Sequence, residues 1–195
     1  MATPAEPLAV WSGAQRRLHW LTVVLVVLTF PLGWLMVAIP LRQLLLKFLL
    51  YQLHKTLGVT LFGAVLARLA LRALRGRPHW DAALPNWQVA TAAMMHVLLY
   101  GLLLAVPVLG YLTAATAPSQ VPTLFLGIIP IPHLVGPAPA AFAVLRVVHR
   151  WAAVLLVTLA CGHALAAIDN HRRGHMSLRL MWRGRARRSA PPGSA

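Results

Sequence analysis

The sequence predicts an all-α integral membrane protein, a four-helix bundle with its N and C termini on the cytoplasmic side. Of 195 residues, 59% are hydrophobic and only 11% are charged, whereas soluble domains carry about 25% charged residues. Four apolar runs are long enough to cross a bilayer, which takes about 20 residues of helix. Because backbone polar groups in lipid must be satisfied within the segment, these runs predict helices.

We expect the four transmembrane helices at residues 18–39, 46–74, 89–114 and 144–168. They form one domain, residues 16–182, between a disordered N-terminal segment, residues 1–15, and a basic disordered tail, residues 183–195. The stretch 118–139 holds six prolines, a density that forbids a transmembrane helix. We expect an outer cap there, lying in the membrane interface with short helical pieces. No internal repeat is evident.

The formal charge of +15 is concentrated at the ends of the apolar runs. Arg16 and Arg17 precede the first run, and seven arginines follow the fourth. No Lys or Arg lies between the third run and Arg146. By the positive-inside rule, both termini and the loop between the second and third runs lie on the cytoplasmic side of the membrane. Basic flanks of this kind bind membrane lipid, so we expect no nucleic-acid partner.

Nine histidines in a chain with only three acidic residues suggest a chemical role. Ionisable side chains within membrane helices are rare and usually mark function. A single such histidine is more often a core residue bonded to a neighbouring helix, but several together favour a site. Five lie within or at the edges of the expected helices: His19, His54, His96, His149 and His163.

The spacing of His149 and His163 is the most specific signal. Fourteen helical residues bring them to within about 40° of one direction and separate them by about 21 Å. One helix thus presents two imidazoles on one face, one near each side of the membrane. This geometry suits two stacked haems, whereas a single zinc ion needs all its ligands within about 2 Å.

The helix directions sort the remaining histidines by depth. With the N-terminus inside, His54 and His149 share the outer level, so they form the outer pair. At the inner level, His163 pairs with either His19 or His96.

Further residues repeat the 14-residue interval. Gly33 follows His19 and Gly110 follows His96 at this spacing. Glycine leaves room for a flat macrocycle there, or simply allows close helix packing. Arg68 follows His54 at the same interval and reaches the inner level. Its guanidinium group either pairs with a haem propionate or snorkels to the interface.

At these positions the sequence resembles the bacterial cytochrome b561 family, over about residues 16–182. The matching stretches are Arg17-Leu-His-Trp20, Leu53-His-Lys-Thr-Leu-Gly58 with Arg68, His96-Val-Leu-Leu-Tyr100 with Pro107 to Gly110, and His149 with His163. The resemblance implies two haems b, with His19, His54, His149 and His163 as axial ligands of the haem iron, which favours His19 over His96. It also implies a multi-pass protein of the bacterial inner membrane, in contact with ubiquinone or another quinone. His96 is then a quinone hydrogen-bond partner or a support for a ligand.

Bis-histidine ligation fills both axial positions of a haem, so it suits electron transfer. We expect an oxidoreductase that passes electrons from a periplasmic donor, superoxide being the one favoured by the resemblance, to membrane quinone. Five basic residues expected at the outer surface either steer an anion such as superoxide towards the outer haem or are ordinary flanking charges. They are Arg42, Lys47, Lys55, Arg146 and Arg150. Two of them, Lys55 and Arg150, are also candidates for haem propionate contacts. The alternative function is that of a cytochrome b subunit for a partner dehydrogenase or another periplasmic redox protein.

Two non-redox functions compete with this interpretation. A metal or proton transporter usually carries Asp or Glu in mid-membrane, and none is expected there. A structural anchor would leave the histidines bonded within the core. The visible spectrum of the purified protein separates these classes: we expect a Soret band that sharpens on reduction, and a colourless protein after expression with ample haem would contradict the prediction.

Overall fold

The computed structural model describes residues 11–76, 85–174 and 177–182. Four of its helices are long and apolar enough to cross a membrane, which confirms the all-α, four-helix class. They are α1 (Gly13–Ala38), α2 (Leu44–Arg75), α3 (Asn86–Thr116) and α4 (Pro139–Arg172). A turn of 3-10 helix, η1 (Leu41–Gln43), precedes α2, and a short helix, α5 (Ser177–Trp182), follows α4. Residues 1–10 and the predicted tail 183–195 lie outside the described residues.

The start of α1 is set by local hydrogen bonds. The Ser12 hydroxyl accepts a hydrogen bond from the Gln15 backbone N–H at 3.2 Å, and the Gln15 side-chain oxygen accepts one from the Ser12 N–H at 3.0 Å. This capping box satisfies two of the free donors of the first turn. The Gln15 side-chain amide also donates to the Gly76 carbonyl at 3.2 Å, which joins the start of α1 to the end of α2.

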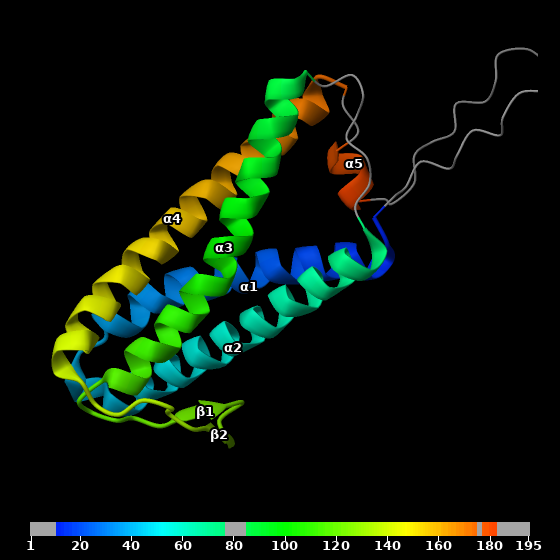
Figure 1. Ribbon diagram of the computed structural model, residues 1–195. Helices are drawn as coiled ribbons and strands as arrows, with labels where there is room; N and C mark the ends of the chain where they lie inside the picture. The colour runs from blue at the N-terminus through cyan, green and yellow to red at the C-terminus, as the bar shows by residue number, and fades with distance from the viewer. Residues whose placement is uncertain (1–10, 77–84, 175–176, 183–195) are drawn as a thin grey trace, which may run out of the picture.

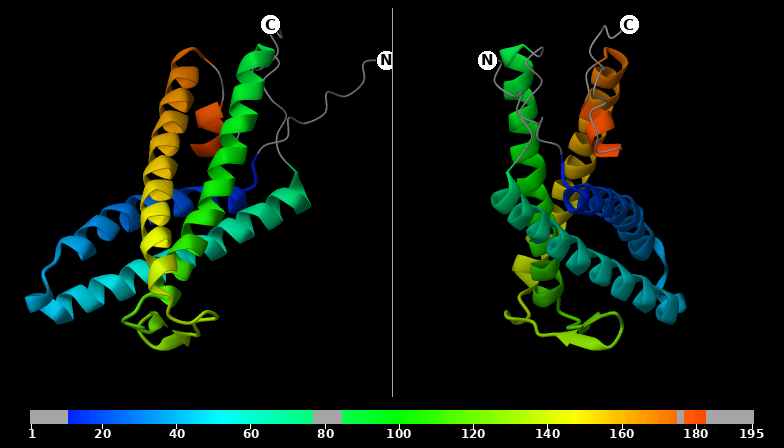
Figure 2. Two further views of the ribbon diagram at one scale, coloured as in Figure 1. Left: turned by 60° about the vertical axis from the view of Figure 1, so that its left-hand side comes forward. Right: turned by 90° about the vertical axis from the view of Figure 1, so that its right-hand side faces the viewer.

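The four long helices form two antiparallel pairs, α1 with α2 and α3 with α4, which cross each other (Figure 1, Figure 2). The two pairs touch mainly through α2 and α3, and much less through α1 and α4. Toward the end where α1 begins and α4 ends, here called the terminal end, the pairs diverge (Figure 1). The opposite end, here called the hairpin end, carries the connection between α3 and α4.

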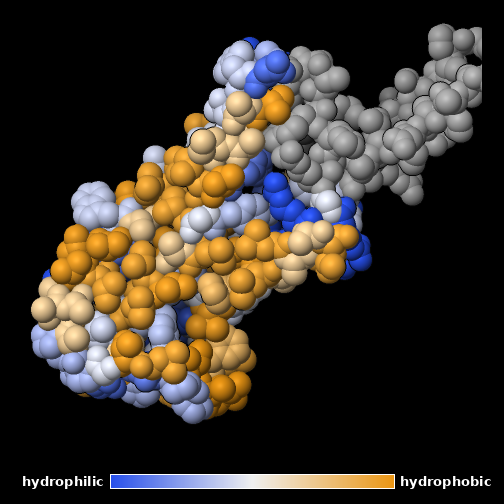
Figure 3. Space-filling model, in the orientation of Figure 1, coloured by the Kyte–Doolittle hydropathy of each residue, from blue (hydrophilic) through white to orange (hydrophobic). Residues whose placement is uncertain are grey.

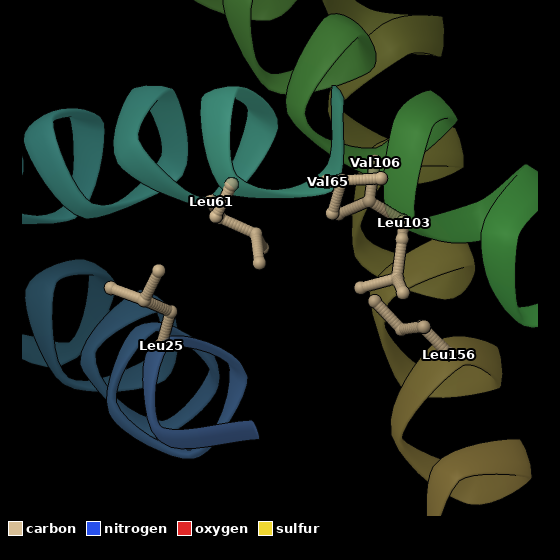
Figure 4. Packing of buried hydrophobic residues seen from close by; sticks show 7 residues of the cluster. Leu25, Leu61, Val65, Leu103, Val106 and Leu156 are labelled. Carbon is tan, nitrogen blue, oxygen red and sulfur yellow. The ribbon is translucent and has the colours of Figure 1, made fainter. Parts of the chain in front are cut away.

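A small apolar core lies where the pairs cross. Leu25 and Leu61 face each other from α1 and α2, and Val65 approaches Val106 and Leu103 of α3 (Figure 4). Leu156 of α4 lies next to Leu103 (Figure 4). Hydrophobic side chains cover most of the visible length of the helices, and hydrophilic ones gather toward the ends (Figure 3). Exposed apolar side chains on every long helix are what a lipid-facing surface requires. The buried cluster comprises Leu25, Leu61, Ala64, Val65, Leu103, Val106 and Leu156.

The proline-rich connection between α3 and α4 folds differently from the expected short helical pieces. It contains an antiparallel hairpin of β1 (Thr123–Phe125) and β2 (Ile129–Ile131), with Leu124 opposite Pro130. The turn between the strands places Gly127 at a φ of 77°, a conformation that glycine adopts without strain. Prolines remove helical N–H donors but are tolerated in short edge strands, so extended segments replace the helices.

Polar side chains of α2 fasten this hairpin to the helix. The Gln52 amide donates to the Pro122 carbonyl at 2.9 Å and accepts from the Leu124 N–H at 3.0 Å. The Thr56 hydroxyl accepts from the Leu126 N–H at 3.2 Å. The Lys55 ammonium donates to the carbonyls of Val121 and Pro122, at 3.1 and 3.3 Å. The next turn of the chain is held from α3, where the Tyr111 hydroxyl donates to the Pro132 carbonyl at 2.9 Å.

Replacing Gln52 by Leu should release the hairpin, because this buried amide satisfies two of its backbone groups. Leaving those groups unpaired costs about 1–3 kcal/mol. We therefore expect faster amide hydrogen exchange across residues 121–126 of the protein in detergent or nanodiscs. The matched control is Gln43→Leu, at an exposed position in η1. Unchanged exchange in the Gln52 variant, or an equal change in the control, would contradict the role of Gln52 in holding the hairpin against α2.

Candidate functional site

Two histidines from different helix pairs meet near the hairpin end. The ring centroids of His54 on α2 and His149 on α4 lie 6.3 Å apart, with the ring planes at 89°. We call these two residues the hairpin-end pair. The structure thus brings together the two side chains that helix direction assigned to one level.

A backbone carbonyl of the adjacent helix orients each ring of this pair. Nδ1 of His54 lies 3.1 Å from the Thr29 carbonyl oxygen, and Nδ1 of His149 lies 3.0 Å from that of Val106. A carbonyl only accepts hydrogen bonds, so each Nδ1 is the protonated donor nitrogen. In the neutral imidazole this leaves an unprotonated Nε2, the form of histidine that binds a metal.

Two glycines make room for these rings. A Cβ atom built on Gly33 would lie 3.0 Å from Cε1 of His54, and one built on Gly110 would lie 3.0 Å from Cε1 of His149. Both positions therefore allow the imidazole to approach the facing helix, where the sequence suggested room for a macrocycle. Gly58, which ends one of the resembling stretches, has open space around it.

The two helix pairs share one arrangement of a carbonyl acceptor, a glycine and a histidine. In each, the helix that begins the pair supplies a carbonyl acceptor and, four residues later, a glycine. The second helix supplies the histidine that fits both. The signal was available in the sequence as the matching segments Leu32-Gly-Trp-Leu35 and Leu109-Gly-Tyr-Leu112. This short similarity was not picked out in the sequence, where no internal repeat was found.

At the terminal end, a second cluster combines His19, Arg68, His96 and His163. The rings of His96 and His163 have centroids 5.2 Å apart and planes at 74°. His19 is not in this ring contact. Its Nδ1 lies 3.1 Å from Nη2 of Arg68, at the level that the 14-residue spacing predicted for this arginine. Since arginine only donates, Nδ1 of His19 is the acceptor, opposite to the tautomer of the hairpin-end pair.

Aromatic and basic side chains surround this terminal-end cluster. The guanidinium carbons of Arg68 and Arg72 lie 5.2 and 5.6 Å from the centroid of the Tyr100 ring. Such cation–π contacts hold the two cations together despite their repulsion. Nδ1 of His96 contacts the Ala92 carbonyl at 2.6 Å, a bond within its own helix.

The basic residues next to the hairpin-end pair have separate contacts. Lys55 donates hydrogen bonds to carbonyls of the hairpin segment. The guanidinium carbon of Arg150 lies 4.6 Å from the centroid of the Trp34 ring, and this contact joins α4 to α1. In the connecting loop, Nε2 of His133 lies 3.2 Å from the Thr123 hydroxyl. Partial burial and the nearby Lys55 ammonium lower the pKa of His133. Sequence reasoning missed the parts played by Trp34, Gln52 and Tyr111.

The donor set fits one kind of metal group. Within residues 11–76, 85–174 and 177–182, no three His, Cys, Asp or Glu side chains converge as a metal site. Two imidazoles that bind one ion from opposite sides, each through a bond of about 2 Å, have ring centroids roughly 6 Å apart, which matches the hairpin-end pair. An ion with only two protein ligands takes its other ligands from outside the chain. The planar nitrogen ring of a haem supplies them.

Four apolar helices that bring histidines of different helix pairs together are typical of a membrane cytochrome of the b type. Comparison with known proteins agrees: the model of the prokaryotic cytochrome b561 family matches residues 10–184. The chain is 29% identical over 178 residues to cytochrome b561 homolog 1 of Escherichia coli K12, covering 88% of this chain and 96% of the relative. It is 29% identical over 156 residues to homolog 2, covering 78% and 80%.

The chain therefore belongs to the prokaryotic cytochrome b561 family. It is a multi-pass bacterial membrane protein that carries b-type haem and transfers electrons.

Adding a methyl group at Gly33 or Gly110 should push the facing imidazole out of place, because the new Cβ would lie 3.0 Å from the ring. Overpacking of this kind costs about 1–3 kcal/mol, so Gly→Ala at either position should weaken haem retention by roughly tenfold or more. Haem transfer to apomyoglobin measures the loss. Gly58→Ala, with open space at its Cβ, is the matched control. Equal retention in all three variants would show that the glycines do not seat the histidines.

Proposed function

We propose that this protein passes electrons through two b haems, from a donor at the outer face of the bacterial inner membrane to quinone. The donor that we favour is superoxide. The observation that carries the proposal is the hairpin-end pair: the two ring centroids lie 6.3 Å apart, and a backbone carbonyl holds each Nδ1, which leaves each Nε2 for the metal. With both termini cytoplasmic, the hairpin end faces outward and the terminal end faces inward.

Each haem, when bound, supplies one-electron redox chemistry without an open coordination position. The chain contributes orientation and exclusion of water. His54 and His149 hold the outer group between the two helix pairs. The buried side chains Leu61, Leu103 and Leu156 keep the region between the two levels dry. Overall, two superoxide ions each lose one electron to give two molecules of dioxygen. One quinone takes the two electrons and two protons to give quinol.

For the inner level we propose His163 and His19 as the ligand pair. These side chains come from α4 and α1, so the group would join different helix pairs, as at the outer level. Ligation through Nε2 requires the His19 proton on Nδ1, which then no longer accepts from Arg68. The guanidinium group of Arg68 is thereby released to a haem propionate. His96, from the same helix pair as His163, then supports that ligand or bonds to quinone.

Substitution of any one of the four proposed ligands should remove the haem at the level of that ligand and leave the other haem in place. We expect His54→Leu and His149→Leu to remove about half of the haem, and His19→Leu and His163→Leu to remove about half as well. His96→Leu should keep both haems, and His171→Leu near the end of α4 is the matched control. The pyridine haemochrome assay gives the stoichiometry. Loss of a haem from the His96 variant, with retention in the His19 variant, would reverse the inner assignment.

The donor is tested by rapid mixing with superoxide in the absence of oxygen. We expect reduction of the haem absorption bands faster than spontaneous dismutation, followed by reoxidation on addition of quinone. At the outer surface, Arg150→Gln should slow the reduction and weaken its dependence on salt, because the positive field that attracts the anion is smaller. Haem bands that stay oxidised would exclude superoxide as the donor.

The second candidate function is a cytochrome subunit that receives electrons from a periplasmic redox protein. It is favoured by the apolar outer edge of the hairpin loop, where Leu126, Ile128 and Leu134 are exposed. A protein partner can cover such a patch. Lack of reaction with superoxide, together with a redox partner that co-purifies and reduces the haem, would support this function instead.

A further inference from the structure

A cavity of about 650 Å³ at the terminal end lies beside the terminal-end cluster. Trp20 lines it, and the rings of Trp20 and His19 meet edge to face with centroids 5.4 Å apart. The cavity is bounded by the first two turns of α1 and by the end of α5. The helix α5 lies near the start of α1 (Figure 1). Its lining comprises Gly13, Arg16, Arg17, Trp20, Met181 and Trp182.

Two contacts between α1 and α5 form one wall of the cavity. The indole N–H of Trp20 donates to the Met181 carbonyl at 3.3 Å, and the rings of Trp20 and Trp182 meet edge to face with centroids 5.1 Å apart. Tryptophan is enriched where a membrane helix meets the headgroup region. The cavity therefore lies at the depth of lipid headgroups, and its aromatic wall is held in place by a hydrogen bond.

The charge of the cavity is uncompensated in the described part of the chain. Arg16 and Arg17 both line it, and the ion pair found among the described residues joins Arg173 to Asp169, elsewhere. The positive end of the α1 dipole adds to this field. Arginine binds phosphate oxygens through a planar fork of donors. A phosphodiester anion would neutralise the site, whereas a neutral ring such as a quinone would leave both charges unpaired.

An apolar track continues from the cavity along the outside of α1. Leu21, Val24 and Leu28 follow Arg17 at intervals of three or four residues, so they share its helix face. All three are exposed. A molecule with an anionic head and a long hydrocarbon chain matches this sequence of surfaces.

We propose that the cavity binds the phosphate group of an anionic phospholipid, with an acyl chain along the exposed face of α1. Arg16 and Arg17 hold the phosphodiester, Trp20 and Trp182 flank the glycerol region, and Leu21, Val24 and Leu28 contact the chain. The bound lipid fastens α5 to α1.

Native mass spectrometry of the haem-loaded full chain in mild detergent tests this site. Phosphatidylglycerol and phosphatidylcholine with identical acyl chains are added in parallel. We expect one phosphatidylglycerol to remain bound at collision energies that remove phosphatidylcholine. The double variant Arg16→Gln with Arg17→Gln should retain it roughly thirtyfold less, given the usual contribution of each basic residue at an anionic membrane. Trp182→Ala should lower retention without altering the charge.

The matched control is Arg75→Gln with Arg172→Gln, which removes two exposed charges at the same end but outside the cavity. It should retain phosphatidylglycerol like the parent chain, and millimolar inorganic phosphate should not displace the lipid. Three results would overturn the proposal: equal retention of the two lipids, equal losses in the test and control variants, or loss of short-chain quinone binding in the Arg16 and Arg17 variant with phosphatidylglycerol retention unchanged. Haem content, measured in each sample, confirms that the variants are folded.

Discussion

The bond between an imidazole and a carbonyl of the neighbouring helix is the interaction on which the site depends. In each helix pair, Nδ1–H of one histidine donates to a carbonyl oxygen across the helix contact. This bond determines both the direction of the ring and the nitrogen that remains free. A glycine opposite each ring permits the approach. Glycine within a helix is destabilising by about 0.5–1 kcal/mol relative to alanine, so each pair gives up some helix stability to seat its histidine.

The arrangement of the two helix pairs is consistent with histidines that bridge them. Direct packing between them is confined mainly to α2 and α3, with a small apolar core at the crossing. The hairpin-end pair spans the two halves, because His54 and His149 come from different pairs. A group held between them therefore contributes to tertiary stability as well as to electron transfer. Metal binding of this kind is part of the folding free energy.

The terminal end departs from the symmetry of the hairpin end. Arg68 and His163 lie at equivalent positions of α2 and α4, 14 residues after a histidine. A cation thus stands where the other half carries an imidazole, and it contacts His19. The two levels consequently differ in their electrostatics, since the hairpin-end rings contact neutral carbonyls and the terminal-end rings lie beside a guanidinium group. A difference in local charge is one of the means by which proteins separate haem potentials.

The sequence alone determined the four spans, the class and the shared level of His54 and His149. These follow from hydrophobic run length and from the rise and turn of a helix, which are local properties. The tertiary structure decided which carbonyl each imidazole contacts, that His96 lies beside His163, and that Arg68 reaches His19. It also decided that the proline-rich loop forms a β-hairpin clamped by Gln52. Each of these depends on side chains from segments far apart in the chain, whose distances helical periodicity does not specify.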